Sequence, residues 1–282
     1  MQERCHGILR PIHLYSKEKV ISMNCNVLLC MKVSEKKWIE KLRNGEACFN
    51  QIDSYIKKSI DDKNDDQGDK YEAVFARIKK TDKRLQELRK RFGEDLEEIQ
   101  DDSDNYVLLR RKSARRILVF CLYGVKAENL KHVDGSYDDS DAEIIRCKGK
   151  YEFSKRMFED FLKISNVYGF YASAGHLFEN IEKALNNNNI TYRKEVIRYE
   201  LDPVEEFYFE PDEKYSELMF KRKDLSYQQE IRYWLLNYSS DRLILNYKKL
   251  KDNSCGYFEG RSYVVFNLAF ITNKLFSTVV KP

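Results

Sequence analysis

The chain has 282 residues, 42% hydrophobic and 34% charged, and its 50 basic and 46 acidic side chains give a formal charge of +4. Its 19 Tyr and 16 Phe exclude a disordered chain, because disordered chains lack the apolar groups that offset ordering entropy. The near-balance of charge does not require a polyanionic partner, so a nucleic-acid role would depend on local clusters of basic residues.

The cysteines and the hydropathy pattern bear on the compartment. Seven cysteines are an odd number and none form a CxxC pair, which favours a reducing compartment with buried thiols. No apolar run approaches the roughly 20 residues of a membrane span, and the N-terminus lacks a long apolar signal region. We therefore expect a cytoplasmic protein without membrane contact.

The first fifty residues predict an arm followed by a compact unit. Residues 1–22 carry no clean periodicity and are expected to form an N-terminal arm. The apolar segment Asn26–Val33 is typical of a strand, and WIEKLRNG (38–45) predicts a helix that ends at Asn44–Gly45. A short strand is expected at Glu46–Phe49.

An acidic loop and a charged helix are expected next. The segment 57–72 is rich in aspartate but lacks the EF-hand spacing, which favours a solvated loop over a calcium site. From Tyr71 to Gln100 apolar residues recur at spacings of three and four, which predicts one long helix within a helical insertion at 71–104. Its basic middle, the stripe at 77–92, is open to three interpretations: a solvated surface, a nucleic-acid face, or an arm for homodimer contacts.

The remaining two thirds of the chain predict alternating strands and helices. Strands are expected at 106–111, 115–123, 167–172, 190–201, 226–237, 243–247 and 262–270, and helices at 153–162 and 177–185. No repeat or Gly/Ser linker divides the chain. The sequence therefore predicts an α+β fold: a mixed or antiparallel central sheet with flanking helices, in a single domain over 23–282 that carries the insertion at 71–104.

Several familiar catalytic patterns are missing from the sequence. It contains no GxGxxG or P-loop glycine spacing, no HExxH, no zinc spacing and no GxSxG. We therefore expect no metal. His176 lies at a predicted helix start, where a capping or partly buried polar role is favoured over catalysis.

The late segment Ser226–Asn237 is the strongest candidate site. Read with a period of two, it puts Gln228, Glu230 and Arg232 on one strand face. A carboxylate in that position can accept a hydrogen bond from a ribose hydroxyl and stabilise an oxocarbenium-like centre, while the amide positions a nucleophile. Arg232 is suited to a phosphate or to holding Glu230. The alternative interpretation is that Glu230 and Arg232 form an ion pair on an edge strand, which would contribute less than about 1 kcal/mol to stability.

The order of these motifs resembles known proteins. FKRxxxSYQQEIRY, preceded by VYGFYASAGHLFENIEKAL and EVIRYE and by a GD-x-x-E step (Gly68, Asp69, Glu72), resembles a group of uncharacterised bacterial and phage proteins. The order is also loosely similar to ADP-ribosyltransferase-like folds, in which an early strand reads the ligand and a late strand bears Q/E-x-E.

This resemblance implies a set of site residues and a substrate. It implies that Glu230 and Gln228 are catalytic and that NAD is the nucleotide. Arg232, from its place on the strand face, and Arg222 are the further candidates for substrate binding. The first strand offers Lys32 where the superfamily has Arg or His, and Tyr171 and Ser173 stand in for the middle-strand element.

Two functions are therefore open from the sequence. The first is a nucleotide-directed transferase or glycohydrolase, in a setting of phage–host conflict. The second is a non-catalytic defence or anti-defence protein that binds a protein or nucleic acid through Lys221–Lys223 and the 77–92 stripe.

Overall fold

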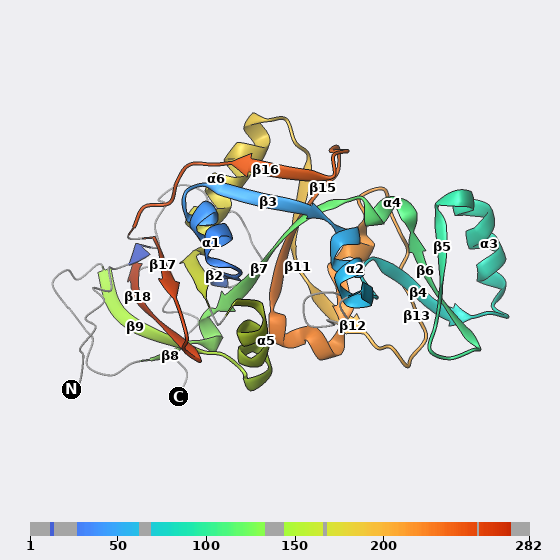
Figure 1. Ribbon diagram of the computed structural model, residues 1–282, viewed down its shortest axis with the longest axis horizontal. Helices are drawn as coiled ribbons and strands as arrows, with labels where there is room; N and C mark the ends of the chain where they lie inside the picture. Colours follow the sequence, from blue (N-terminus) through green and yellow to red (C-terminus); the bar gives the residue numbers. More distant parts are fainter. Residues whose placement is uncertain are drawn as a thin grey trace. The chain divides into compact units, whose positions relative to one another are not determined.

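The computed structural model describes residues 12–13, 27–61, 69–132, 144–165, 168–252 and 254–271 (Figure 1). The chain divides into two compact units. The first unit comprises 1–45, 124–182 and 247–282, and the second comprises 46–123 and 183–246. Each unit is assembled from segments that are distant in sequence. The prediction of one domain over 23–282 stays a prediction.

The first unit holds two arrangements of mainly antiparallel strands. In one, β10 (Gly169–Ser173) lies between β2 (Val27–Val33) and β17 (Cys255–Phe258). In the other, β18 (Tyr263–Ile271) pairs with β9 (Ile144–Glu152), which also pairs with β8 (Lys131–His132), while the two residues of β1 (Ile12–His13) pair in parallel with β18. The helices are α1 (Lys36–Arg43), α5 (Lys155–Ser165) and the start of α6 (Ala174–Asn187).

The larger sheet of the second unit is antiparallel. Its order is β11 (Tyr192–Val196), β15 (Glu230–Leu235), β7 (Leu118–Lys126), β3 (Glu46–Gln51) and β16 (Arg242–Asn246). All six residues of β15 are buried, and Trp234 packs with Ile52, Ile117 and Val119 in a core under α2 (Ile52–Asp61) and α4 (Lys112–Arg115). A strand buried on both faces gives a polar side chain little access to water, which makes Glu230 and Arg232 unusual.

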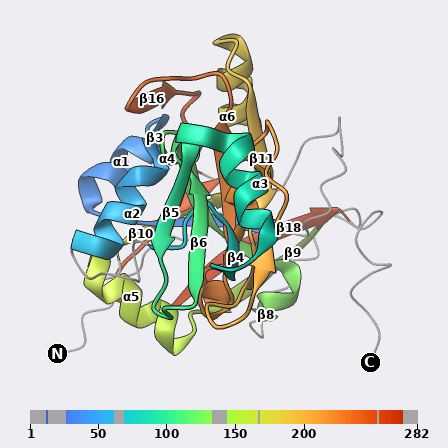
Figure 2. The ribbon, with the colours of Figure 1, turned by 90° about the vertical axis from the view of Figure 1, so that its right-hand side faces the viewer.

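A smaller sheet of the same unit has the order β13 (Phe207–Tyr208), β4 (Val74–Lys79), β6 (Tyr106–Arg111) and β5 (Leu96–Gln100). Figure 2 faces this sheet and shows α3 (Lys83–Phe92) beside it, where Leu85 and Leu88 pack on Phe75 and Ile78. Two further strands, β12 (Arg198–Leu201) and β14 (Phe220–Arg222), pair in parallel.

The single helix predicted over 71–100, within the insertion at 71–104, is wrong. The segment forms a strand, a ten-residue helix and a second strand. The helix begins after Asp82, whose carboxylate accepts the Arg84 backbone N–H at 2.8 Å, and it ends at Gly93, which has φ +52°. These are an N-cap and a glycine C-cap, and they cut the apolar pattern into pieces. The run Val74–Ile78 is buried on both strand faces, so its spacing does not reveal a helix.

Most other predicted elements are confirmed to within a few residues. The strands at 26–33, 46–49, 106–111, 115–123, 167–172, 243–247 and 262–270 and the helices at 38–45, 153–162 and 177–185 all have counterparts, and the predicted α+β class is confirmed. Helix α2 was missed because it overlaps the expected acidic loop, of which 62–68 lie outside the described residues. Most of the predicted arm at 1–22 also lies outside the described residues. Within the described residues, no helix is long and apolar enough to cross a lipid bilayer.

Candidate functional site

The predicted strand 226–237 begins later than expected. Residues Lys223–Gln228 form a 3-10 helix, and Gln229 follows with φ +44° and ψ +46° before β15 starts at Glu230. Left-handed backbone is uncommon for a residue other than glycine and is often found at functional sites. The prediction that Gln228 shares a strand face with Glu230 is therefore wrong, because Gln228 lies in the turn.

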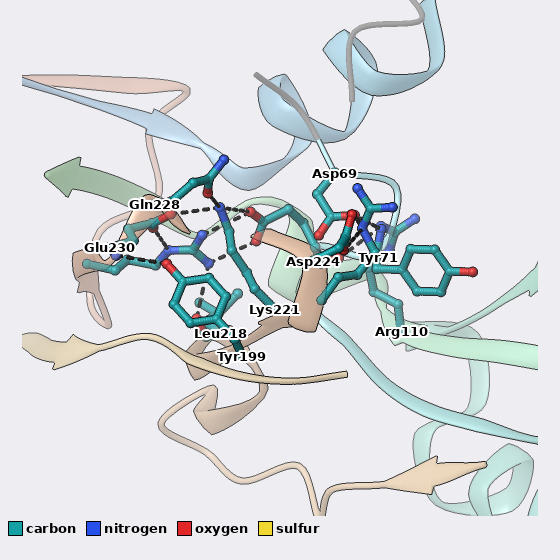
Figure 3. Close-up of polar contacts among 12 residues, drawn as sticks. Asp69, Tyr71, Arg110, Tyr199, Leu218, Lys221, Asp224, Gln228 and Glu230 are labelled. Atoms are coloured by element: carbon teal, nitrogen blue, oxygen red, sulfur yellow. Dashed lines mark hydrogen bonds and ion pairs between the residues drawn. The ribbon is translucent and has the colours of Figure 1, made fainter. Parts of the chain in front are cut away.

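Lys221 nevertheless brings the two side chains together. Its Nζ donates to Gln228 Oε1 at 3.1 Å and to Glu230 Oε2 at 2.7 Å (Figure 3). Lys221 lies on β14, which pairs in parallel with β12. This position places the Lys221 ammonium next to Glu230, the first residue of β15. The backbone N–H of Glu230 donates to the Tyr199 hydroxyl at 2.8 Å, which holds the strand end in place.

Arg232 connects Glu230 to a second carboxylate. Its Nε donates to Glu230 Oε1 at 2.7 Å, and its two terminal nitrogens each lie 2.9 Å from the Glu72 carboxylate. A further donation reaches the Leu218 carbonyl at 3.0 Å, and Lys221 Nζ lies 3.2 Å from Glu72 Oε1. The result is a closed network of two carboxylates and two cations. Glu72, Lys221, Glu230 and Arg232 expose 2, 7, 6 and 1% of their surfaces.

The network keeps its carboxylates ionised. Burial opposes ionisation of Glu230, but Arg232 and Lys221 lower the pKa of Glu230 below its ordinary value. The pKa of Glu72 is lowered against the same burial by the same two cations. Burial likewise opposes the charge on Lys221, but the Glu230 and Glu72 carboxylates raise its pKa well above the ordinary value. At neutral pH Glu230 is therefore a carboxylate that cannot donate a proton.

No protein-family model, curated protein or solved structure matches the chain. The resemblance to bacterial and phage proteins and to ADP-ribosyltransferase-like folds stays a prediction. What the site can do must be argued from its own geometry.

Asp69 and Arg222 extend the network on the side of Glu72. Asp69 Oδ1 accepts the Tyr71 N–H at 2.9 Å and lies 3.2 Å from Arg222 Nε, whereas Oδ2 is buried with no hydrogen-bond partner among the described residues. Burial, with repulsion from Glu72, raises the pKa of Asp69 to about 6. The GD-x-x-E step pointed to Asp69 and Glu72; its Gly68 lies outside the described residues.

The remaining predicted substrate residues belong to the first unit, and they do not share one face. Lys32 on β2 is paired with Phe170 on β10, whereas Tyr171 is paired with Met31. Paired residues point to the same face and successive residues to opposite faces, so Lys32 and Tyr171 lie on opposite faces of this sheet. Tyr171 and Ser173 share a face and both are buried. The expected grouping of Lys32 with Tyr171 is wrong.

The basic surface predicted at Lys221–Lys223 does not form. Lys221 is buried in the network, Arg222 pairs with Asp69, and Lys223 lies 3.3 Å from Asp202. The arginines of the 77–92 stripe are paired as well: Arg77 with Asp101, Arg84 with Asp82, Arg89 with Glu98 and Arg91 with Glu210. These ion pairs neutralise much of the positive charge of both segments. Binding of a protein or nucleic acid stays a prediction.

Two observations concern other ligands. Within the described residues, no three His, Cys, Asp or Glu side chains gather in a way that could hold a metal ion. Two clefts in the second unit are lined by residues other than Glu230: one of about 490 Å³ beside Asp53 and Arg115, and one of about 340 Å³ beside β16.

Proposed function

We propose that this chain is a nucleotide-directed transferase or glycohydrolase in which Glu230 is the catalytic carboxylate. The observation that carries the proposal is a buried carboxylate that Lys221 and Arg232 each contact at 2.7 Å, with the Gln228 amide bonded to the same lysine. Burying charges costs free energy that apolar side chains would avoid, and shifted pKa values of this kind cluster at functional sites.

The chemistry follows from the charge of Glu230. Cleavage of NAD breaks the bond between ribose C1′ and the nicotinamide nitrogen, both electrons leave with nicotinamide, and an oxocarbenium-like centre forms. An ionised carboxylate accepts a ribose hydroxyl hydrogen bond and stabilises that positive charge. The nucleophile then bonds to C1′ and releases its proton to solvent, because the lowered pKa of Glu230 makes it a poor base.

The other residues support Glu230 in this proposal. Arg232 uses its N–H groups on Glu230, Glu72 and the Leu218 carbonyl, so it acts as a positioning residue for Glu230 and does not grip a phosphate. Gln228 is the group expected to orient the nucleophile. Because Glu230 and Gln228 are 6 and 7% exposed, a substrate must displace the Lys221 ammonium or the turn at Gln229 to reach the carboxylate.

The test follows nicotinamide release from NAD by the purified chain. We expect turnover that Glu230→Gln abolishes, while Glu98→Gln, which removes a carboxylate from an exposed pair with Arg89, keeps it. Circular dichroism checks that each variant is folded. Gln228→Ala is a milder second variant that leaves the four charges intact, and it is expected to lower kcat. Equal turnover in a folded Glu230→Gln variant would end the proposal, as would a wild-type chain that releases no nicotinamide.

A further inference from the structure

The cleft beside β16 lies in the second unit and has no charged lining. Its volume is about 340 Å³, and it is lined by Asn188, Asn189, Ile190, Asn237, Tyr238, Leu243, Ile244, Leu245 and Asn246. Four of these nine residues are asparagines and four are aliphatic. In a chain with 34% charged residues, a cleft lined entirely by neutral side chains favours an uncharged ligand.

The cleft runs along an edge of β16. Four consecutive residues of this strand, Leu243 to Asn246, line it. Successive side chains of a strand point to opposite faces, so a cavity on one face would touch every second residue. A cavity that touches four residues in a row is not confined to one face, and along the free edge of β16 the N–H and C=O groups of Ile244 and Asn246 point away from β3.

This edge of β16 is unpaired within the part of the chain that the structure describes. β16 pairs with β3 over Arg242–Asn246, and no other described strand is hydrogen-bonded to it. Ile244 exposes 45% of its surface. Unpaired apolar edges invite another strand, and proteins usually blunt them with lysine, proline or a bulge. No such device interrupts Leu243–Asn246.

The opposite wall is held rigidly by its own hydrogen bonds. Asn237 Oδ1 accepts the Thr191 N–H at 2.7 Å, and its Nδ2 donates to the Asn189 carbonyl at 3.1 Å. Asn188 Nδ2 donates to the Ala184 carbonyl at 2.8 Å. These bonds leave further donors and acceptors on the amides, since each asparagine side chain has two N–H groups and an oxygen with two lone pairs. A pre-formed wall lowers the entropy cost of binding.

We propose that this cleft binds an extended, uncharged polypeptide segment of a partner protein, which pairs as an added strand with the free edge of β16. The backbone of the segment supplies the donors and acceptors that the edge lacks, and its alternate side chains meet the asparagine wall and Ile244. Leu243–Asn246 span about 13 Å, the length of a four-residue strand, with the outward N–H and C=O groups supplied by Ile244 and Asn246. The neutral lining excludes charged segments, because a buried unpaired charge is costly. This binding does not depend on the proposed reaction at Glu230.

A capped eight-residue peptide of alternating valine with asparagine or serine is the probe. Binding to the full chain is measured by chemical-shift changes on the ¹⁵N-labelled protein, together with hydrogen exchange of the Ile244 and Asn246 amides, which point away from β3. We expect shifts confined to β16 and the Asn188–Ile190 and Asn237–Tyr238 segments, and slower exchange in β16. Two control peptides are each expected to bind at least about tenfold more weakly. One is N-methylated at alternate amides and so lacks backbone donors, and the other is charged because glutamate replaces asparagine.

The matched variants are Ile244→Lys and Val204→Lys. Both residues are exposed aliphatic side chains of the second unit, at 45 and 79%, but only Ile244 lines the cleft. Ile244→Lys should weaken peptide binding by about tenfold or more, and Val204→Lys should leave it unchanged. Equal binding of the N-methylated peptide, loss of binding in both variants, or a cleft that binds adenosine or a methyl glucoside but not the peptide would overturn the proposal.

Discussion

Arg232 Nε lies 2.7 Å from Glu230 Oε1, two residues earlier on the same strand, and both side chains are buried. An adjacent pair of this kind on a strand face is usually solvated. Here the pair is closed by two residues from elsewhere, Glu72 and Lys221, so that charge is balanced inside the second unit. Removing one member leaves a buried charge uncompensated.

Arg232→Leu should therefore destabilise the chain strongly. The variant leaves Glu72 and Glu230 facing a single cation, and breaking a buried pair costs about 3–5 kcal/mol. The free energy of unfolding from urea denaturation measures the loss. Arg89→Leu is the control, because it breaks an exposed pair with Glu98 that is worth less than about 1 kcal/mol. Similar losses for the two variants would mean that the network contributes no more than a surface pair.

Local signals in the sequence were enough to predict much of the fold. The first strand, helix α1 and β3 were predicted because an apolar run, an amphipathic segment and Asn44–Gly45 follow one another without ambiguity. The segment 71–104 failed because a strand buried on both faces and a short amphipathic helix together imitate one long helical pattern.

The candidate site could be predicted only in part. Glu230 and Arg232 were identified because charges in an apolar strand are conspicuous. Their partner Glu72 lies 160 residues from Arg232 in sequence, and no local pattern reveals such a pairing. The left-handed backbone of Gln229 was also hidden, since neither glycine nor asparagine marks it.

Asp69 predicts an unusual dependence of stability on pH. Burial and Glu72 raise its pKa from 3.8 to about 6, so between these values the folded state binds more protons than the unfolded state. Stability from this group is complete below about pH 4 and is lost as pH rises through about 6. The loss is on the order of 3 kcal/mol, because one pKa unit corresponds to about 1.4 kcal/mol.

Asp69→Asn removes this dependence and supplies the comparison. Urea denaturation from pH 4 to 7 should show the wild-type chain losing stability relative to Asp69→Asn as pH rises. Glu72 has the opposite sign: its pKa is lowered from 4.5, so its contribution is present above pH 4.5 and is lost as pH falls below that value. Parallel pH profiles for wild type and Asp69→Asn would refute the assignment to Asp69.

Gly169 is expected to tolerate no side chain. A Cβ at this position would lie 2.2 Å from Cζ of the buried Phe258 ring on the neighbouring strand β17. Gly169→Ala must therefore displace a packed aromatic ring, at a cost of about 1–3 kcal/mol. Gly175→Ala, in α6, meets nothing within 4 Å and should be neutral or stabilising by up to about 1 kcal/mol. Thermal unfolding of the two variants checks the contrast, and equal melting temperatures would contradict it.

A double-mutant cycle on Lys221 and Glu230 separates a balanced network from a set of independent pairs. Lys221→Met alone leaves two carboxylates against Arg232, and Glu230→Gln alone leaves two cations against Glu72. Together the two changes remove one charge of each sign and restore the balance. The double variant should therefore be more stable than the sum of the single losses predicts, by about 0.5–3 kcal/mol, the usual range for groups in contact.

The control cycle combines Lys221→Met with Glu98→Gln. Glu98 lies on β5 of the smaller sheet, where its carboxylate accepts from Arg89, and it makes no contact with Lys221. The two losses of unfolding free energy should therefore add within about 0.5 kcal/mol. Urea denaturation at pH 7 measures all five variants and the wild type. Additivity in both cycles would mean that Lys221 and Glu230 do not stabilise one another. Coupling in the first cycle alone would establish that Lys221 is the counter-ion of Glu230 in the folded chain.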